Sequence, residues 1–202
     1  MFTGIINDIG TVRSVEQRGD LRLTISTAYD PASLDLGASI ACSGVCLTVV
    51  DKGANWFAVD VSNESVSCTA AAHYSEGARL NLERALRMGD ELGGHLVTGH
   101  IDGIGTVTAT AADGDSTRIA VQVPRHLGRF IAAKGSVTLD GVSLTVNEVT
   151  DAVDCTNFFI NLIPHSAQHT TLGSLSAGQL VNIEIDVLAR YLKRLEDSRR
   201  IA

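Results

Sequence analysis

Short segments in which apolar and polar residues alternate occupy most of this chain. They cover residues 21–27, 38–44, 46–51, 56–61 and 79–85 in the first half, and 117–123, 136–141, 143–149, 157–163 and 179–185 in the second. Many are rich in β-branched residues, and turn residues separate them, which is typical of half-buried strands. With opening strands at the TGI and TGH motifs (residues 3–5 and 98–100), we expect about six strands in each half.

The two halves also repeat each other. TGIINDIGTV at 3–12 matches TGHIDGIGTV at 98–107, SGVCLTV at 43–49 matches DGVSLTV at 140–146, and LNLERA at 80–85 matches VNIEID at 181–186. The distance between matched blocks grows slowly from 95 to 97 to 101 residues, as loop insertions in the second copy would cause. Two copies are too few for a solenoid, so we predict two domains, residues 1–93 and 94–186, joined near Gly93–Gly94.

Six short strands need closure to hide their edges, and a small antiparallel barrel provides it. The predicted fold is therefore all-β, with two tandem six-stranded, Greek-key-like antiparallel barrels. Proline begins a segment at corresponding points of the two copies, at 31–34 and 124–130, where we expect one or two helical turns.

The last residues follow a different pattern. From Val187 to Arg200 the apolar residues fall on one helical stripe, made of Val187, Leu188, Tyr191, Leu192 and Leu195. The opposite side carries Arg190, Lys193, Arg194 and Glu196. We therefore predict a C-terminal α-helix and tail over residues 187–202. Its stripe needs a cover, and either a barrel or another copy of the chain can supply one.

Composition narrows the classes of function. The chain has 202 residues, 45% of them hydrophobic and 19% charged, which fits a globular protein with a substantial core. A net charge of −7 argues against nucleic acids and anionic membranes as partners, and 4% aromatic residues argue against a base-stacking platform. No apolar run approaches the ~18 residues of a membrane span, and the first ten residues do not resemble a signal peptide.

Four cysteines are present, and none forms a C-x-x-C pair, which makes a zinc ribbon or a thioredoxin-type site improbable. We therefore expect a cytoplasmic protein with reduced thiols and without a bound metal.

Six blocks in order make the chain similar to the riboflavin synthase family. They are MFTGI at the start, GVCLTV at 44–49, GGHLVTGHIDG at 93–103, DGVSLTVN at 140–147, NLIPHS at 161–166 and VNIEIDVLARYL at 181–192. Any one block is a weak signal, but together they span essentially the whole chain with the family's spacing.

The resemblance implies a transferase that completes riboflavin biosynthesis. Two molecules of 6,7-dimethyl-8-ribityllumazine would yield riboflavin and 5-amino-6-ribitylaminouracil by transfer of a four-carbon unit, without cofactor or metal. The family's members are homotrimers held by the C-terminal helix, with the site between the N-terminal barrel of one subunit and the C-terminal barrel of its neighbour. An association with lumazine synthase is left open.

The resemblance also implies two substrate pockets. The N-terminal pocket would use Gly4, Ile5, Ile6, Ser39, Cys46, Leu47 and Thr48, closed by Asp60, Val61, Ser62, Asn63, Glu64 and Ser65. The C-terminal pocket would use Gly99, His100, Ile101, Lys134, Ser143, Leu144 and Thr145, closed by Asn161, Leu162, Ile163, Pro164, His165 and Ser166. Backbone groups can hydrogen-bond a pteridine edge, and Asp60 and Asn161 can bind ribityl hydroxyls. Met1 and Phe2 are expected to fold into the site.

Our hypothesis for catalysis assigns Cys46, His100 and Asp140, with Ser39, most of the effect beyond proximity. One lumazine must lose a C7-methyl proton, and C7 of the other must accept a nucleophile. Cys46 would position the substrate or act as a nucleophile, and His100 would orient it or exchange protons. The copies differ where this matters, at Cys46/Ser143, Ser43/Asp140 and Ile5/His100.

Each of these residues also has a purely structural interpretation. A buried cysteine is usually inert packing, and a single histidine is more often a hydrogen-bonded structural residue. Lys134 would be solvated beside Gly135, and Asp140 would cap a turn before Gly141.

Two other functions compete with this hypothesis. A fluorescent lumazine- or flavin-binding protein has the same duplicated barrel without turnover. A flavin-dependent reductase domain also uses a small β-barrel, but it needs a nucleotide-binding unit, and the chain has no strand–GxGxxG–helix motif.

Overall fold

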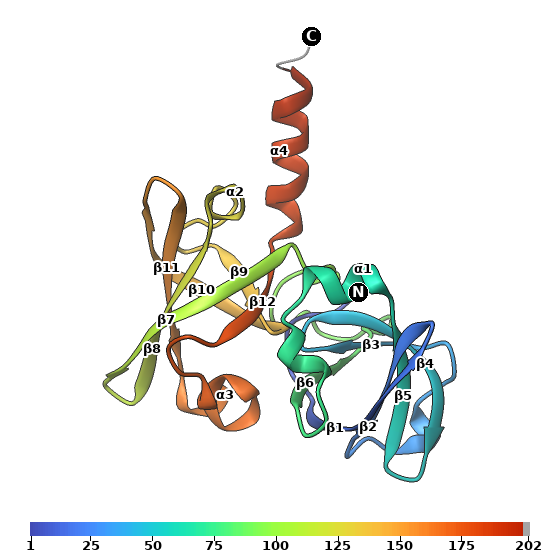
Figure 1. The fold of residues 1–202 in the computed structure, drawn as a ribbon. Coiled ribbons are helices and arrows are strands. Elements are labelled where there is room, and N and C mark those ends of the chain that lie inside the picture. The colour runs from blue at the N-terminus through green and yellow to red at the C-terminus, as the bar shows by residue number, and fades with distance from the viewer. Residues whose placement is uncertain (200–202) are drawn as a thin grey trace.

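The computed structural model describes residues 1–199, which form two β-barrels and a C-terminal helix (Figure 1). Each barrel is a closed antiparallel sheet of six strands, which confirms the predicted fold class. The first barrel contains β1 (Asp8–Arg18), β2 (Asp20–Ser26), β3 (Ser39–Cys42), β4 (Val45–Gly53), β5 (Trp56–Val61) and β6 (Arg79–Arg84). The second contains β7 (Gly103–Asp113), β8 (Ser116–Pro124), β9 (Ser136–Leu139), β10 (Val142–Asp151), β11 (Cys155–Leu162) and β12 (Leu180–Ile185).

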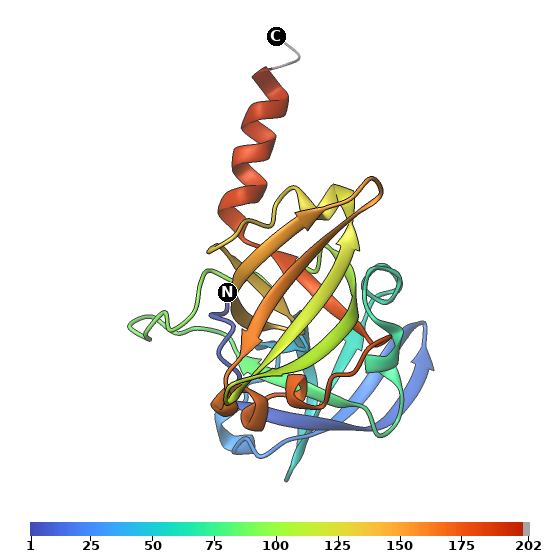
Figure 2. The same cartoon turned by 90° about the vertical axis from the view of Figure 1, so that its left-hand side faces the viewer.

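The two barrels share one strand order. Around the first it is β1-β2-β5-β4-β3-β6, and the second repeats it with β7 to β12 in the same roles. The alternating side chains fill both barrels, with Phe57 at the centre of one core and Phe158 in the other, each without exposed surface. Figure 2 shows the two barrels packed against each other and the helix rising away from them.

The TGI and TGH motifs do not form strands, so that prediction was wrong. β1 begins only at Asp8 and β7 only at Gly103. The reason lies in the glycines of the two motifs, since Gly4 has φ +77° and Gly99 has φ +79°, outside the extended region. Their backbone N–H groups bond to side chains instead of a strand ladder.

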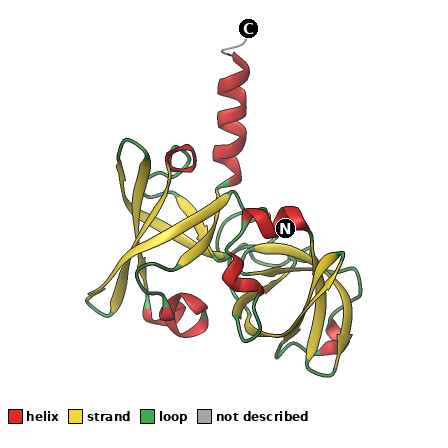
Figure 3. Cartoon of the chain, in the orientation of Figure 1, coloured by secondary structure: helices red, strands yellow, loops and turns green. Residues whose placement is uncertain are grey.

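Short helices fill the connections between strands (Figure 3). The proline-initiated turns appear as η1 (Pro31–Ser33) and α2 (Arg125–Gly128). Two further pairs were not predicted from the sequence, namely α1 (Asn63–Cys68) with η2 (Ala71–Tyr74) and α3 (Pro164–His169) with η3 (Thr171–Ser174). Six residues are under two helical turns, too few for a helical period to show.

The predicted C-terminal helix is α4 (Val187–Arg199), while Arg200 and the tail lie outside the described residues. Along this described length no residue of α4 is buried. Its stripe is open to solvent, with Leu188 65%, Tyr191 64%, Leu192 67% and Leu195 58% exposed. Over residues 1–199 no helix combines the length and apolar character that a bilayer span requires.

Candidate functional site

The TG segments cross from one barrel to the other. The backbone N–H of Cys46, in the first barrel, donates to the carbonyl oxygen of Gly99 at 2.9 Å, and the N–H of Ser143, in the second, donates to that of Gly4 at 2.9 Å. Ile101 then packs against the first core, whereas Ile6 packs against the second. Each barrel is therefore completed by the segment that precedes the other.

A buried glutamate holds each crossing segment. Glu83 accepts hydrogen bonds from the N–H of Thr3 at 2.7 Å, its hydroxyl at 2.7 Å and the N–H of Gly4 at 2.9 Å. Glu184 repeats the arrangement with Thr98, at 2.7 and 2.6 Å, and with Gly99 at 2.9 Å. Burial raises the pKa of both carboxyl groups, and the hydrogen bonds from the threonines oppose that rise. The two clamps fix where the crossing segments bend.

Close backbone approach explains why glycine stands at the crossing. A Cβ at Gly99 would lie 2.6 Å from Cβ of Cys46, and a Cβ at Gly4 would lie 2.5 Å from Cβ of Ser143. Both distances are too short for any side chain. The glycine of each TG motif is therefore needed for contact as well as for its positive φ.

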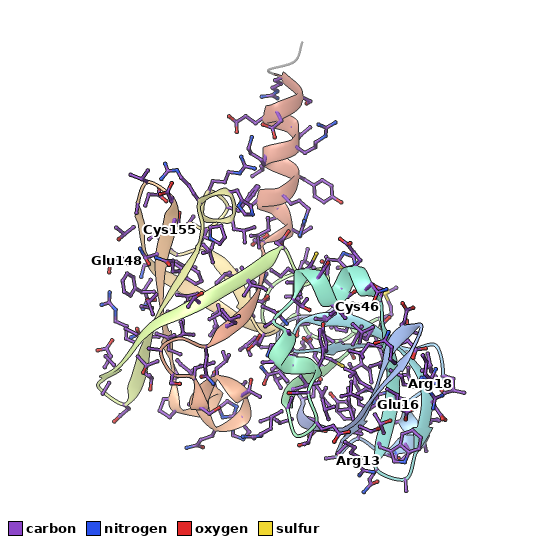
Figure 4. All side chains as sticks on the ribbon, in the orientation of Figure 1. Arg13, Glu16, Arg18, Cys46, Glu148 and Cys155 are labelled. Atoms are coloured by element: carbon purple, nitrogen blue, oxygen red, sulfur yellow. The ribbon has the colours of Figure 1, made fainter. Side chains whose placement is uncertain are left out.

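We call the contact between Gly99 and Cys46 the first crossing and that between Gly4 and Ser143 the second. A pocket of about 200 Å³ opens at the first crossing. Cys46, Gly99, His100 and Ile101 form one side, and α1 faces them across the pocket. Figure 4 labels Cys46 beside α1, where the first barrel faces the second. The helical spacing of i, i+1 and i+4 directs Glu64, Ser65 and Cys68 of α1 to this pocket, and Thr69, which follows the helix, also lines it. The pocket offers the thiols of Cys46 and Cys68 and the exposed imidazole of His100 to a ligand.

The second crossing has a corresponding but different neighbourhood. The chain from Ile6 to Ile9 and the end of α3, with Gln168 and His169, line a pocket of about 300 Å³. On the outer side, Ile5 and Gly93 border another of about 520 Å³. The chain from Thr3 to Ile9 therefore borders two cavities, of which only the one at α3 includes residues of the second barrel.

The side chain of Ser143 has a hydrogen-bond partner, whereas that of Cys46 has none among residues 1–199. Its hydroxyl lies 2.8 Å from Nδ1 of His95, a residue in the connection between the barrels. Nε2 of His95 is buried without a partner among the described residues, and burial lowers the pKa of this imidazole. Sequence reasoning did not single out His95 as a site residue, because it lies before the repeat block that begins at Thr98.

The crossing corrects the predicted grouping of the pockets. We expected Gly4, Ile5 and Ile6 beside Cys46, and Gly99, His100 and Ile101 beside Ser143. The structure places them the other way round, because each TG segment docks on the opposite barrel. Because both copies carry the same TG pair, the motif itself does not reveal which barrel each segment contacts.

The four residues of the catalytic hypothesis are not all in one place. Cys46 and His100 share the pocket beside α1, but Asp140 and Ser39 are not among the residues that line it. Asp140 is 2% exposed at the interface between the barrels. Its carboxylate accepts from the N–H of Asn182 at 2.8 Å and lies 3.5 Å from Nε2 of His73. Ser39 pairs with Thr48 in the ladder between β3 and β4 and borders a separate pocket of about 220 Å³.

Other predicted contacts have partners within the chain. The Asp60 carboxylate forms a double hydrogen bond with Arg22, at 2.7 and 2.9 Å, and Arg22 holds the pKa of this carboxyl below its usual range. The Asn161 amide donates to Asp113 at 2.6 Å, while its carbonyl oxygen is buried without a partner among the described residues. Lys134 is exposed and has φ +67°.

The remaining predicted residues divide between core and surface. Leu47, Val61 and Leu162 are buried in the cores, and Leu144 packs against the second one. Exposed residues are Thr48, Ser62, Asn63, Glu64, Thr145, Ile163, Pro164 and His165, while Ser65 and Ser166 are half-buried.

The N-terminus lies at the first crossing. Phe2 is fully buried and bridges to Val97, and a Cβ at Gly99 would lie 3.0 Å from its ring. Met1 is exposed, and its carbonyl oxygen accepts from the N–H of Leu86 at 2.9 Å. Phe2 thus supports the Gly99 segment that forms the pocket.

Neither the thiols nor the acidic groups form a metal centre in the part of the chain that the structure describes. Within residues 1–199 no three His, Cys, Asp or Glu side chains gather closely enough to hold an ion. All four cysteines are free.

Comparisons with known proteins agree with the duplication. The model of the lumazine binding domain matches residues 3–85 and again residues 98–186. A riboflavin synthase of Brucella abortus (strain 2308) is 51% identical over 201 residues, covering 96% of this chain and 98% of that protein. A riboflavin synthase of Bacillus subtilis (strain 168) is 37% identical over 195 residues, covering 96% of this chain and 89% of that protein.

Solved structures show the same fold. LumP complexed with riboflavin aligns with a TM-score of 0.81 at 27% identity, and LumP complexed with 6,7-dimethyl-8-(1'-D-ribityl) lumazine aligns with a TM-score of 0.79 at 26% identity. Each alignment covers 92% of this chain and 99% of LumP. With both barrels matched and riboflavin synthases similar over nearly its full length, the chain belongs to the lumazine binding domain family.

Proposed function

We propose that this chain is a riboflavin synthase, which dismutates two molecules of 6,7-dimethyl-8-ribityllumazine to riboflavin and 5-amino-6-ribitylaminouracil. The observation that carries this proposal is the pair of crossed segments, which builds two related pockets in one chain. Relatives named riboflavin synthase support the reaction, and LumP complexes with lumazine and riboflavin support the ligands.

Two related pockets suit a reaction between two identical molecules. Holding both reactants in a fixed orientation can supply on the order of 7–11 kcal/mol of the barrier. The two crossings have diverged, with Cys46 and His100 at one and Ser143 hydrogen-bonded to His95 at the other. This difference gives a physical basis for unlike donor and acceptor roles.

The proposed chemistry needs little more than proton transfer and one addition. His100 is exposed at the Cys46 pocket, where it can take a proton from the C7 methyl group or return one. The Cys46 thiol can approach the electrophilic C7 or hold the ring in place. Asp140 and Ser39 do not line this pocket, so the proposed step rests on Cys46 and His100.

We further propose a homotrimer assembled through α4. The exposed stripe on this helix is an apolar surface of the kind that self-association covers. In such a trimer the first barrel of one chain would face the second barrel of its neighbour, so that two lumazine molecules meet across the boundary. This arrangement follows the resemblance to the riboflavin synthases.

The alternative function is binding of lumazine or flavin without turnover, since LumP holds both ligands on the same fold. Incubation of the purified chain with 6,7-dimethyl-8-ribityllumazine alone separates the two functions. We expect one riboflavin for every two lumazine molecules consumed, measured by chromatography with fluorescence detection. Lumazine that stays bound and unconverted would contradict the proposal and support the alternative.

A further inference from the structure

An ion pair joins the C-terminal helix to the segment that lines the Cys46 pocket. The Arg190 guanidinium, in α4, donates to both carboxylate oxygens of Asp102 at 2.7 and 2.9 Å. Asp102 directly follows Ile101, which lines the pocket together with Gly99 and His100. Paired bonds of this kind fix the relative orientation of the two groups.

Asp102 is well placed to transmit position. Its side chain is only 10% exposed, and one of its oxygens also accepts from the N–H of Ile185 at 2.9 Å. Its own N–H donates to the carbonyl oxygen of Ile183 at 2.8 Å. A single residue therefore connects the pocket segment, the end of β12 and the first turns of α4.

The first copy has no such connection. Asn7 occupies the position equivalent to Asp102, and its side-chain oxygen accepts only a long bond from the N–H of Arg84, at 3.4 Å. Asn7 has no charge to offer a guanidinium, and the first copy is not followed by a long helix. The carboxylate therefore stands only in the copy that carries α4, which argues for a role linked to that helix.

We propose that Asp102 and Arg190 are a positioning pair that couples the direction of α4 to the geometry of the Cys46 pocket. The proposal rests on the proposed function, because it treats this pocket as a lumazine site. No residue of α4 is buried over its described length, and the helix rises away from the barrels (Figure 1). The ion pair ties its first turn to Asp102. A neighbouring copy that grips α4 would thus also hold Asp102, and with it His100 and Ile101.

Coupling of this kind is reciprocal, because a contact at α4 that strengthens ligand binding must itself be strengthened by the ligand. Breaking the pair should therefore weaken ligand binding and loosen the assembly together. We choose riboflavin as the probe, since its binding can be measured without turnover.

The test uses Arg190→Met, Asp102→Asn and the double variant. Asp102→Asn keeps an oxygen to accept from Ile185, so the barrel should stay folded, and thermal unfolding checks this. We expect each single variant to bind riboflavin at least about fivefold more weakly, the lower end of typical coupling. The double variant should be no worse than either single one, because the two residues act through each other. Arg190→Lys should recover part of the affinity.

Arg194→Met is the matched control, since it removes an exposed cation from the same helix. Molar mass in solution and the separate values of kcat and KM are measured alongside. We expect Arg190→Met to raise KM and to lower the molar mass at low protein concentration, whereas Arg194→Met should do neither.

Riboflavin affinity in Arg190→Met within twofold of Arg194→Met would overturn the coupling, even if the molar mass changed. Failure of the proposed function gives a different result, namely a wild-type chain that makes no riboflavin from lumazine. If the wild-type chain turns over lumazine and the variants bind riboflavin with unchanged affinity, the proposal of a positioning pair is wrong while the proposed function stands.

Discussion

The two barrels keep the same framework and differ at the junction between them. In both, a buried glutamate clamps a TG segment, and an asparagine reaches across the interface. The Asn81 amide donates to the carbonyl oxygen of Asp140 at 3.0 Å, and that of Asn182 donates to the carbonyl oxygen of Ser43 at 2.9 Å. The interface therefore has an approximate two-fold symmetry in its hydrogen bonds.

The charged groups break that symmetry. Asp140 faces His73 at 3.5 Å, whereas the corresponding residues on the other side are Ser43 and Ser174. Asp102 holds Arg190, whereas Asn7 holds no cation. The duplication therefore preserved the contacts that place the backbone and changed the charged side chains at the junction of the barrels.

A side chain that blocks the close backbone approach at either crossing should cause the largest loss of stability. In Gly99→Ala and Gly4→Ala the new methyl group meets a neighbouring residue at 2.6 or 2.5 Å while φ remains positive. Overpacking and backbone strain together should cost about 2–5 kcal/mol of unfolding free energy. Urea unfolding measures this cost. Gly19→Ala is the control, because Gly19 has φ +88° with nothing near it, and an equal loss there would contradict the importance of the contact.

Replacement of His100 should show whether this residue of the Cys46 pocket takes part in proton transfer. If His100 exchanges protons with the substrate, His100→Gln should lower kcat by about 100-fold, the lower end for general acid–base catalysis, with riboflavin affinity changed little. Steady-state conversion of lumazine measures the effect. His126→Gln, in α2 of the second barrel, serves as the control. Wild-type kcat in His100→Gln would remove this residue from the mechanism.

Substitution of either clamping glutamate should lower the unfolding free energy by a similar amount, but only one of the two substitutions should weaken ligand binding beside Cys46. In Glu83→Gln or Glu184→Gln, one amide N–H₂ would face a backbone donor, so each change should cost about 1–3 kcal/mol. Denaturant unfolding measures both. Only the Glu184 variant should disturb a ligand beside Cys46, because Glu184 holds Gly99. Glu148→Gln, at an exposed pair with Arg118, should change stability by less than about 0.5 kcal/mol.

The smallest effect should be a pH dependence at the interface. Hydrogen bonding and charge from Asp140 raise the pKa of His73 despite its burial. The pair therefore contributes stability that is complete below the ordinary imidazole pKa of about 6.5 and is lost as pH rises through the folded value. The difference in unfolding free energy between wild type and His73→Ser should shrink from pH 6 upward. A difference that grows with pH would contradict this sign.

Much of the fold can be predicted from the sequence. Apolar and polar residues alternate along the barrel strands with a period of two, and the repeated blocks indicate two copies of one barrel. The helix α4 is predicted for the same reason, since its stripe from Leu188 to Leu195 has a clear helical period. The strands predicted at the TG motifs were wrong, because three residues are too few to show a period. The conformation of these motifs depends on contacts with residues distant in sequence.

The arrangement of the candidate site could not be predicted from the sequence. Local motifs do not reveal that Gly99 docks on the first barrel or that Asp140 faces inward between the barrels. One signal was present, namely the glutamate repeated in LNLERA and VNIEID. Leu82 and Ile183 point into the cores, so Glu83 and Glu184 lie on the opposite faces of their strands. A charged residue repeated at this position of two matching strands indicates a partner, here the backbone of the crossing segment.

A crystal structure of the chain with bound riboflavin tests the central claim, that exchanged segments build two unlike ligand pockets, most directly. We expect the ligand to contact Cys46 together with Gly99, His100 and Ile101 of the same chain, and any ligand in the second barrel to contact Ser143 together with Gly4. Riboflavin held by Cys46 together with Gly4 and Ile6 of the same chain, or bound away from both crossings, would contradict the account.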